Sequence, residues 1–139
     1  MGKLIFRYGT MNSGKSLNLL SVNYNYNQND VNVLIMKPHE DTRDMGEIGT
    51  RLAKDLSVPA YTFVKDDNLI QKYNDISSST SKSYDVLLVD EAQFVTTAQA
   101  RQLGYIAYVL DVMVICYGLK IDFKAEPFAG SAMLMAMAG

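Results

Sequence analysis

The stretch "YGTMNSGKSLNLL", residues 8–20, contains a complete GxxxxGK[ST] pattern. Glycines let a backbone turn tightly and bring its N–H groups onto phosphate oxygens, while the lysine supplies a positive charge and the serine an oxygen for magnesium. The pattern therefore predicts a phosphate-binding loop, with a solvated surface turn as the alternative. The residues expected to hold the nucleotide are Gly9, Thr10, Met11, Asn12, Ser13, Gly14, Lys15 and Ser16.

The sequence on either side of this loop favours phosphate binding. Residues 3–9 form a short apolar run typical of a strand, and residues 16–28 place Leu17, Leu20 and Tyr24 near helical spacing. A strand, a glycine loop and a helix N-terminus in that order make an anion site, because the first N–H groups and the dipole of the helix face the phosphate.

The rest of the chain alternates between strand-like and helix-like segments. Further strands are expected at residues 31–38, 60–64, 86–91 and 112–118, and further helices at 67–76 and 97–110, with a loop at 39–50 and either a loop or a frayed helix end at 77–83. Apolar strands separated by helices indicate a single α/β domain over residues 1–139, with a parallel sheet of the P-loop NTPase type flanked by helices. A ligand of such a sheet lies at the carboxyl ends of its strands.

Composition limits the partners and the compartment. The net charge of −2, from 13 basic and 15 acidic residues, gives no basic footprint for nucleic acid, so a small molecule is the expected substrate. No apolar run approaches the length that spans a membrane, and we expect no membrane partner. The single cysteine excludes an internal disulfide, which makes the reducing cytoplasm the default location.

The stretch "VLLVDE", residues 86–91, supplies the second candidate group. Four apolar residues predict a buried strand that delivers Asp90 to its carboxyl end, where a carboxylate can hold magnesium directly or through water. Any strand can end in aspartate, but the phosphate loop favours the magnesium role. Glu91 is open to two interpretations from the residues alone, a general base or a residue in a helix cap or surface ion pair.

Four motifs together resemble one enzyme family. They are "GTMNSGKS" at 9–16, "KPHEDTRD" at 37–44, "VDEAQF" at 89–94 and "CYGLKIDFKAEPFAGS" at 116–131. In this order the chain resembles the type II thymidine kinases, the zinc-bearing and tetrameric family, through nearly all its length. The resemblance implies transfer of the ATP γ-phosphate to the 5′-hydroxyl of thymidine with Mg²⁺, and a homotetramer.

The resemblance also implies roles for individual residues. The implied catalytic residues are Lys15, Arg43 and Glu91, and the implied magnesium residues are Ser16, Asp90 and Asp41, partly through water. Lys15 would hold the ATP phosphates, Arg43 would stabilise charge on the transferred group, and Glu91 would accept the proton of the attacking hydroxyl. Without the resemblance, Asp41 and Arg43 would be ordinary solvated loop residues.

A nucleoside pocket carries over from the family less completely. The matching positions are Met11, Phe94, Leu119 and Phe123. An apolar pocket with a few aimed polar groups is the general form of a small-molecule site. Each of these residues could equally be plain core, although a large side chain inside a phosphate loop, as at Met11, is well placed to touch the acceptor.

The C-terminus departs from the family pattern. The family continues into a subdomain with four structural zinc ligands and a lasso loop over thymine, whereas one cysteine cannot supply four ligands, so we expect that subdomain to be absent from this chain. The main hypothesis is therefore a thymidine kinase core. The alternatives are a non-catalytic ATP-binding or assembly module and a different P-loop phosphotransferase.

Overall fold

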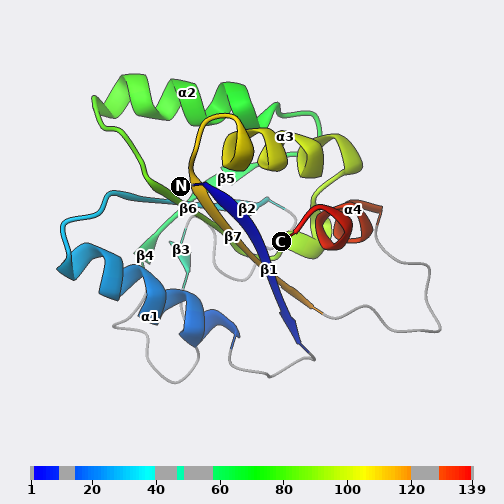
Figure 1. The fold of residues 1–139 in the computed structure, drawn as a ribbon, viewed down its shortest axis with the longest axis horizontal. Helices are drawn as coiled ribbons and strands as arrows, with labels where there is room; N and C mark the ends of the chain where they lie inside the picture. The colour runs from blue at the N-terminus through cyan, green and yellow to red at the C-terminus, as the bar shows by residue number, and fades with distance from the viewer. Residues whose placement is uncertain (1, 10–14, 40–46, 49–57, 120–128, 139) are drawn as a thin grey trace.

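The structure of the chain is a computed structural model, and it describes residues 2–9, 15–39, 47–48, 58–119 and 129–138. Its centre is a five-stranded sheet with the order β1-β7-β6-β2-β5, and every pair of neighbours is parallel (Figure 1). These strands are β1 (Lys3–Gly9), β2 (Val33–Pro38), β5 (Tyr61–Phe63), β6 (Val86–Val89) and β7 (Met113–Leu119). A separate antiparallel pair joins β3 (Glu47–Ile48) to β4 (Val58–Pro59).

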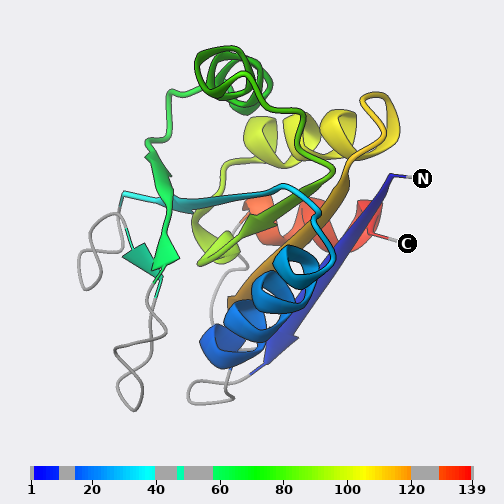
Figure 2. The ribbon, with the colours of Figure 1, turned by 90° about the vertical axis from the view of Figure 1, so that its left-hand side faces the viewer.

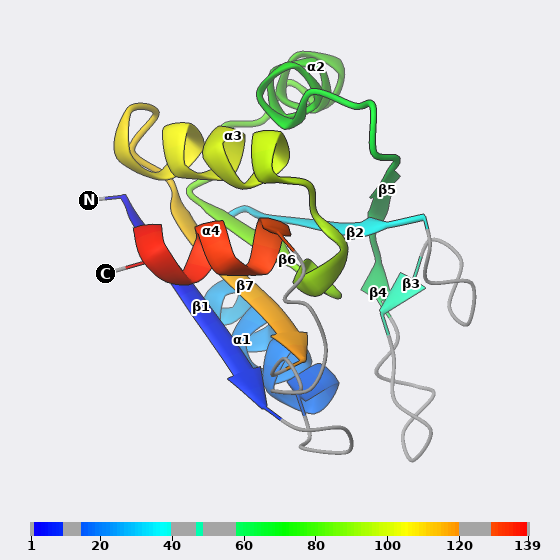
Figure 3. The same cartoon turned by 90° about the vertical axis from the view of Figure 1, so that its right-hand side faces the viewer.

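Helices cover both faces of the five-stranded sheet. Helix α1 (Lys15–Gln28) lies on one face, and α2 (Leu69–Thr80), α3 (Thr97–Tyr108) and α4 (Ala129–Met137) lie on the other (Figures 2 and 3). All four residues of β6, the middle strand, are buried. A strand buried on both sides has no solvent face to reserve for polar residues, which explains its continuous apolar sequence. No described helix combines the length and the apolar character needed to cross a membrane.

The first turns of α2 and α3 are fixed by polar side chains. Asn68 caps α2 by accepting hydrogen bonds from the backbone N–H groups of Ile70 (2.9 Å) and Gln71 (3.1 Å). At α3, Thr96 and Gln99 form a reciprocal capping box, in which each side chain accepts from the other residue's backbone N–H. Such caps satisfy N–H groups that have no partner inside the helix.

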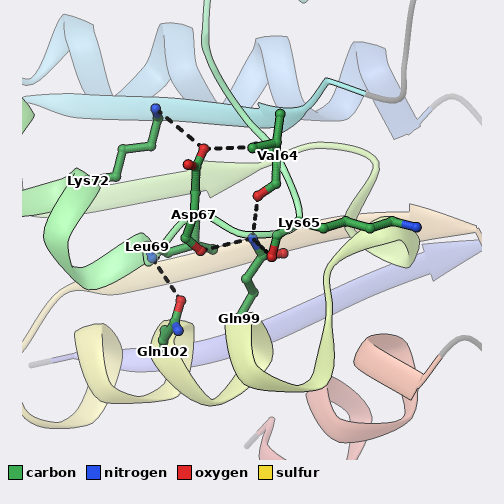
Figure 4. A network of polar contacts seen from close by, with 7 residues as sticks. All are labelled: Val64, Lys65, Asp67, Leu69, Lys72, Gln99 and Gln102. Atoms are coloured by element: carbon green, nitrogen blue, oxygen red, sulfur yellow. Dashed lines mark hydrogen bonds and ion pairs between the residues drawn. The ribbon is translucent and has the colours of Figure 1, made fainter.

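Gln99 also ties α3 to the turn that precedes α2. Its side-chain amide donates to the carbonyls of Val64 (2.8 Å), Lys65 (3.3 Å) and Asp67 (3.1 Å), as Figure 4 shows. A second glutamine of α3, Gln102, accepts from the backbone N–H of Leu69 at 2.8 Å. These bonds hold the first turn of α2 against α3 in addition to the apolar core that the two helices share.

Helix α4 approaches the loop before α3 closely at Gly130. A β-carbon at this position would lie 1.8 Å from the carbonyl oxygen of Val95. Glycine is therefore required for α4 to pack where it does. Leu134 then enters the main core with no exposed surface.

The observed elements confirm the expected parallel α/β sheet flanked by helices. The strand expected at residues 3–9 is β1, and the short expected strand at 60–64 is β5, two residues shorter. Of the two interpretations left open for residues 77–83, the structure supports the helix end, because α2 continues to Thr80 and has Ser81 as its C-cap. The Thr80 hydroxyl donates back to the carbonyl of Ile76 at 2.7 Å, so the hydroxyl is satisfied within the helix and does not end it. Within the expected loop at 39–50, the two residues of β3 are extended.

Candidate active site

The carboxyl edge of the sheet is where the candidate site begins. Strand β1 ends at Gly9 and α1 begins at Lys15, and the first turn of α1 lies at the same end of the sheet as the carboxyl ends of β1 and β7 (Figure 1). A helix N-terminus beside strand ends favours negative charge, because its first N–H groups and its dipole point there. The positions of β1 and α1 agree with the strand and the helix predicted on either side of the phosphate loop.

Two carboxylates follow β6 at this edge. Asp90 and Glu91 are only 4% and 5% exposed, although both are acidic. The backbone N–H of Asp90 donates to the carbonyl of Met36 at 3.0 Å, which continues the pairing between β6 and β2 by one residue. Buried carboxylates are rare unless they are paired or bind a cation. Their position therefore agrees with a functional site better than with an exposed ion pair at Glu91.

Glu91 has an unusual backbone conformation. Its φ of 52° and ψ of 42° lie in the left-handed region, where a non-glycine residue is disfavoured by about 1 kcal/mol. Three other described non-glycine residues share a positive φ, namely Asp30, Ser81 and Asp111, but all three are exposed. Buried strain of this kind clusters at functional sites. It turns the chain sharply between β6 and the short 3₁₀ helix η2 (Ala92–Phe94).

Gln93 holds the Glu91 carboxylate. Its side-chain amide donates to Oε2 of Glu91 at 2.7 Å, and both side chains are buried. Gly118 on β7 makes room for this contact, since a β-carbon there would lie 3.2 Å from both the backbone nitrogen and Oε1 of Gln93. Sequence reasoning missed Gln93, even though it stands inside the "VDEAQF" motif at 89–94.

A row of four polar residues crosses the sheet at the level of Asp90. Arg7 is paired with Tyr117 across β1 and β7. Asp90 follows the last paired residue of β6, which aligns it with Tyr117 on one side and with Lys37 of β2 on the other. We call Arg7, Tyr117, Asp90 and Lys37 the polar row. It places two cations at its ends and a phenol and a carboxylate between them.

The polar row faces α1. Alternate residues of a strand lie on the same face, so the row continues the α1 side of the sheet. The apolar residues two positions earlier on three of these strands pack with Leu19 and Leu20 of α1, and they are Ile35, Leu88 and Ile115. Tyr117 and Lys37 are each only 1% exposed. Lysine is almost never buried to this extent without a partner, so Lys37 is a further site residue that the sequence did not reveal.

Tyr117 is influenced by its charged neighbours in the row. Burial raises the pKa of its phenol, the nearby Arg7 guanidinium opposes that rise, and the Asp90 carboxylate adds to it. The Arg7 guanidinium itself donates to Oδ1 of Asn18 in the first turns of α1 at 3.0 Å. Arg7 thus connects the row to the helix that follows the phosphate loop.

The structure brings some of the expected site residues together and leaves others outside its description. Asp90 and Glu91 are adjacent and buried, and Phe94 is half-buried at the end of η2. Only the backbone positions are described for Gly9, Lys15, Ser16 and Leu119. The residues Thr10, Met11, Asn12, Ser13, Gly14, Asp41, Arg43 and Phe123 lie outside the described residues. Their roles remain predictions.

Asp90 fits one part of a magnesium site. The described residues contain no group of three or more His, Cys, Asp or Glu side chains that could hold a metal. Magnesium does not need such a group, since it keeps several waters and binds through one or two carboxylates plus substrate phosphates. A buried carboxylate at the carboxyl edge of the sheet, the end at which α1 begins, is compatible with that coordination.

Two shallow hollows lie beside α1, away from Glu91. The larger, of about 360 Å³, is lined by Asn23 and Asn27 of α1 together with residues from the first half of β2 and the start of β5. Those residues belong to the amino ends of the strands, opposite the carboxyl edge. The smaller, of about 260 Å³, lies between α1 and the Arg7 end of the polar row. Neither hollow is lined by Asp90 or Glu91, so neither marks the position of the candidate active site.

Comparisons with known proteins agree on one family. The sequence model described as thymidine kinase matches residues 2–139. Proteins named thymidine kinase from Shewanella oneidensis, Mannheimia succiniciproducens and Legionella pneumophila strain Paris are 38%, 40% and 42% identical to this chain over 139 residues. The matches cover 99% of this chain and 70%, 69% and 65% of those proteins.

A solved structure shares the fold. The Pif1 helicase from Candida albicans superposes with a TM-score of 0.56 over 99% of this chain and 34% of the helicase chain. The two sequences are 20% identical. At this level the similarity concerns the fold alone.

Proposed function

The chain belongs to the thymidine kinase family, and we propose that it transfers the γ-phosphoryl group of ATP to the 5′-hydroxyl of thymidine. The observation that carries this proposal is the buried pair Asp90–Glu91 at the carboxyl edge of the sheet, the end at which α1 also begins. One carboxylate would bind the cation, and the other would accept the proton of the attacking hydroxyl. Phosphoryl transfer needs both, because its barrier is lowered mainly by alignment and by neutralising charge.

Glu91 is proposed as the general base. Its carboxylate would accept the proton of the 5′-hydroxyl while that oxygen bonds to the γ-phosphorus and ADP departs. The hydrogen bond from Gln93 holds one carboxylate oxygen, Oε2, and limits rotation of the side chain.

Asp90 is proposed to bind magnesium, with Ser16 and Asp41 contributing, partly through water. Bound magnesium would neutralise charge on the phosphate oxygens of ATP. Lys15 and the backbone of residues 9–16 would hold those phosphates, and Arg43 would stabilise the transferred group. Support for Asp90 comes from its burial and its place at the sheet edge. Support for the other residues comes from the family motifs.

The acceptor would lie against Met11, Phe94, Leu119 and Phe123. Of these, support for Phe94 comes from its half-buried position at the end of η2, the short helix that follows the buried pair Asp90–Glu91. A homotetramer in the cytoplasm, with no nucleic-acid partner, completes the proposal by resemblance. Size-exclusion chromatography with light scattering would measure the oligomeric state.

The test is phosphoryl transfer from γ-labelled ATP to thymidine with Mg²⁺, using the 139-residue chain. We expect labelled thymidine monophosphate to form, and we expect Glu91→Gln to lower the rate about 100-fold or more while ATP still binds. Asp85→Asn is the matched control, because Asp85 is exposed at the opposite end of β6 and should leave the rate unchanged.

Two results would overturn the proposal. Hydrolysis of ATP that does not need thymidine would identify a different phosphotransferase or an ATPase. Binding of ATP without transfer to any nucleoside would identify a nucleotide-binding module.

A further inference from the structure

The hydroxyl of Tyr117 has no hydrogen-bond partner within the described part of the chain, although the side chain is almost completely buried. A buried hydroxyl without a partner costs about 1–3 kcal/mol on the scale of protein mutations. Tyr73, a buried tyrosine on α2, avoids that cost by donating to the carbonyl of Tyr84 at 2.7 Å. The isolated hydroxyl of Tyr117 therefore needs a physical explanation.

The neighbours of Tyr117 limit what its hydroxyl can pair with. Arg7 carries only donors, so it can donate to the phenol oxygen but cannot accept the phenol proton, and Oδ1 of Asn18 already accepts from Arg7. Asp90 is the carboxylate aligned with Tyr117 in the polar row, and it is close enough to raise the pKa of the phenol. The charged acceptor best placed for the Tyr117 hydroxyl is therefore Asp90.

We propose that Tyr117 is a positioning residue whose hydroxyl donates a hydrogen bond to the Asp90 carboxylate when magnesium and the nucleotide are bound. The inference rests on the proposed function, because it assumes that Asp90 serves the cation. Among the described residues the hydroxyl has no hydrogen-bond partner. With one Asp90 oxygen on the cation, the other would accept from the phenol, and a hydrogen bond to a charged acceptor is stronger than one to a neutral acceptor.

The proposed hydrogen bond predicts that Tyr117→Phe, which removes one oxygen atom and keeps the ring, changes the Mg²⁺ requirement but not the stability. The metal-free protein should lose no stability, and its urea midpoint should stay the same or rise. The Mg²⁺ concentration for half-maximal transfer should increase three- to tenfold. The rate at saturating Mg²⁺ should change less, because the cation then holds Asp90 without help.

Tyr73→Phe is the matched control. It removes a hydroxyl that is bonded in the resting protein, so it should lower the urea midpoint and leave the Mg²⁺ requirement unchanged. The two variants make the same chemical change on opposite faces of the sheet. Opposite outcomes in stability and in Mg²⁺ dependence would support the positioning role.

A second measurement separates this inference from the proposed reaction. The thermal midpoint is compared with ATP plus Mg²⁺ and with ATP plus EDTA, so that the difference reports the cation without any turnover. We expect Tyr117→Phe to reduce this difference and Tyr73→Phe to preserve it. If the wild-type chain transfers no phosphate, the reaction fails but this comparison still tests Tyr117.

Two outcomes would overturn the inference. A lower urea midpoint or a failure to fold in Tyr117→Phe would show that the hydroxyl has a partner in the resting protein. An unchanged Mg²⁺ requirement, together with an unchanged thermal difference, would show that the hydroxyl does not act on Asp90.

Discussion

The two faces of the sheet differ in how they are built. On the face covered by α2, α3 and α4, twenty buried residues form one continuous apolar core among the described residues, and both α2 and α3 begin with side-chain caps. On the face covered by α1, the corresponding cluster has seven buried residues, and the polar row lies beside it. The larger core must supply most of the stability, because hydrophobic stabilisation grows with the apolar area removed from water.

The contrast shows how one sheet can separate stability from chemistry. Buried polar groups such as Asp90 and Lys37 are costly to bury and are tolerated where a ligand will use them. The face covered by α2, α3 and α4 can offset that cost, because its apolar core is the larger one and both α2 and α3 begin with side-chain caps. Variants on the two faces should therefore affect different measurements.

The largest effect is expected from a paired truncation of fully buried leucines. Leu103→Ala on α3 should lower the free energy of unfolding by about 3–5 kcal/mol, and Leu19→Ala on α1 by about 2–3 kcal/mol, because the α1 cluster is smaller. Urea unfolding measures both losses. Per folded molecule, Leu103→Ala should keep normal kcat/KM, whereas Leu19→Ala should lower it by shifting the start of α1. Equal kinetic effects would contradict the division between the faces.

A smaller effect is expected at Gln99. Gln99→Ala removes the amide that donates to three carbonyls before α2 and also half of the α3 capping box, so unfolding should become easier by about 2–3 kcal/mol. Hydrogen exchange should rise over residues 64–70. Gln102→Ala removes a single acceptor and should cost only about 1 kcal/mol. If Gln102→Ala costs as much, the network in Figure 4 is not centred on Gln99.

Alkaline pH should weaken both faces modestly. Burial is the main cause that raises the phenol pKa of Tyr73 on one face and Tyr117 on the other. Above about pH 10 the unfolded chain loses these protons while the folded chain keeps them, so the free energy of unfolding falls by up to about 1.4 kcal/mol per pH unit for each phenol. Urea midpoints from pH 8 to 11 measure the slope. Tyr73→Phe and Tyr117→Phe should each flatten it, and a slope unchanged by either substitution would contradict this origin.

The smallest effect is expected at Cys116, which lies in the larger core. Burial raises the pKa of its thiol, and alkylation requires the thiolate. Iodoacetamide should therefore label the native chain at least about 100-fold more slowly than the urea-unfolded chain. Mass spectrometry over time measures both rates. Rapid labelling of the native chain would show that the face covered by α2–α4 opens readily.

The sequence predicted the sheet because its signals are local. A run such as "VLLV" at 86–89 identifies a buried strand by its composition, and the carboxylates at its end follow directly from their position in the chain. The polar row was not predictable in this way. Arg7, Tyr117, Asp90 and Lys37 come from four strands that are far apart in sequence, and only the strand order and register align them.

Two local features also could not be predicted from the sequence, the contact made by Gln93 and the end of α2. The bond from Gln93 to Glu91 depends on the left-handed turn at Glu91 and on the absence of a side chain at Gly118. Serines and threonine at 77–80 are typical of loops, yet here the hydroxyls of Ser79 and Thr80 donate to the carbonyl of Ile76 within the helix. In both cases the outcome depends on the backbone path, which composition does not specify.

The left-handed backbone at Glu91 also affects which mutations can inactivate the protein without unfolding it. Glycine and asparagine adopt that conformation more readily than glutamate does. A mutation from Glu91 to either residue would remove the proposed base while relaxing the chain at that point. Cellular quality control recognises unfolded chains and would not remove these folded variants. Inactive forms would therefore persist wherever selection for thymidine salvage is weak.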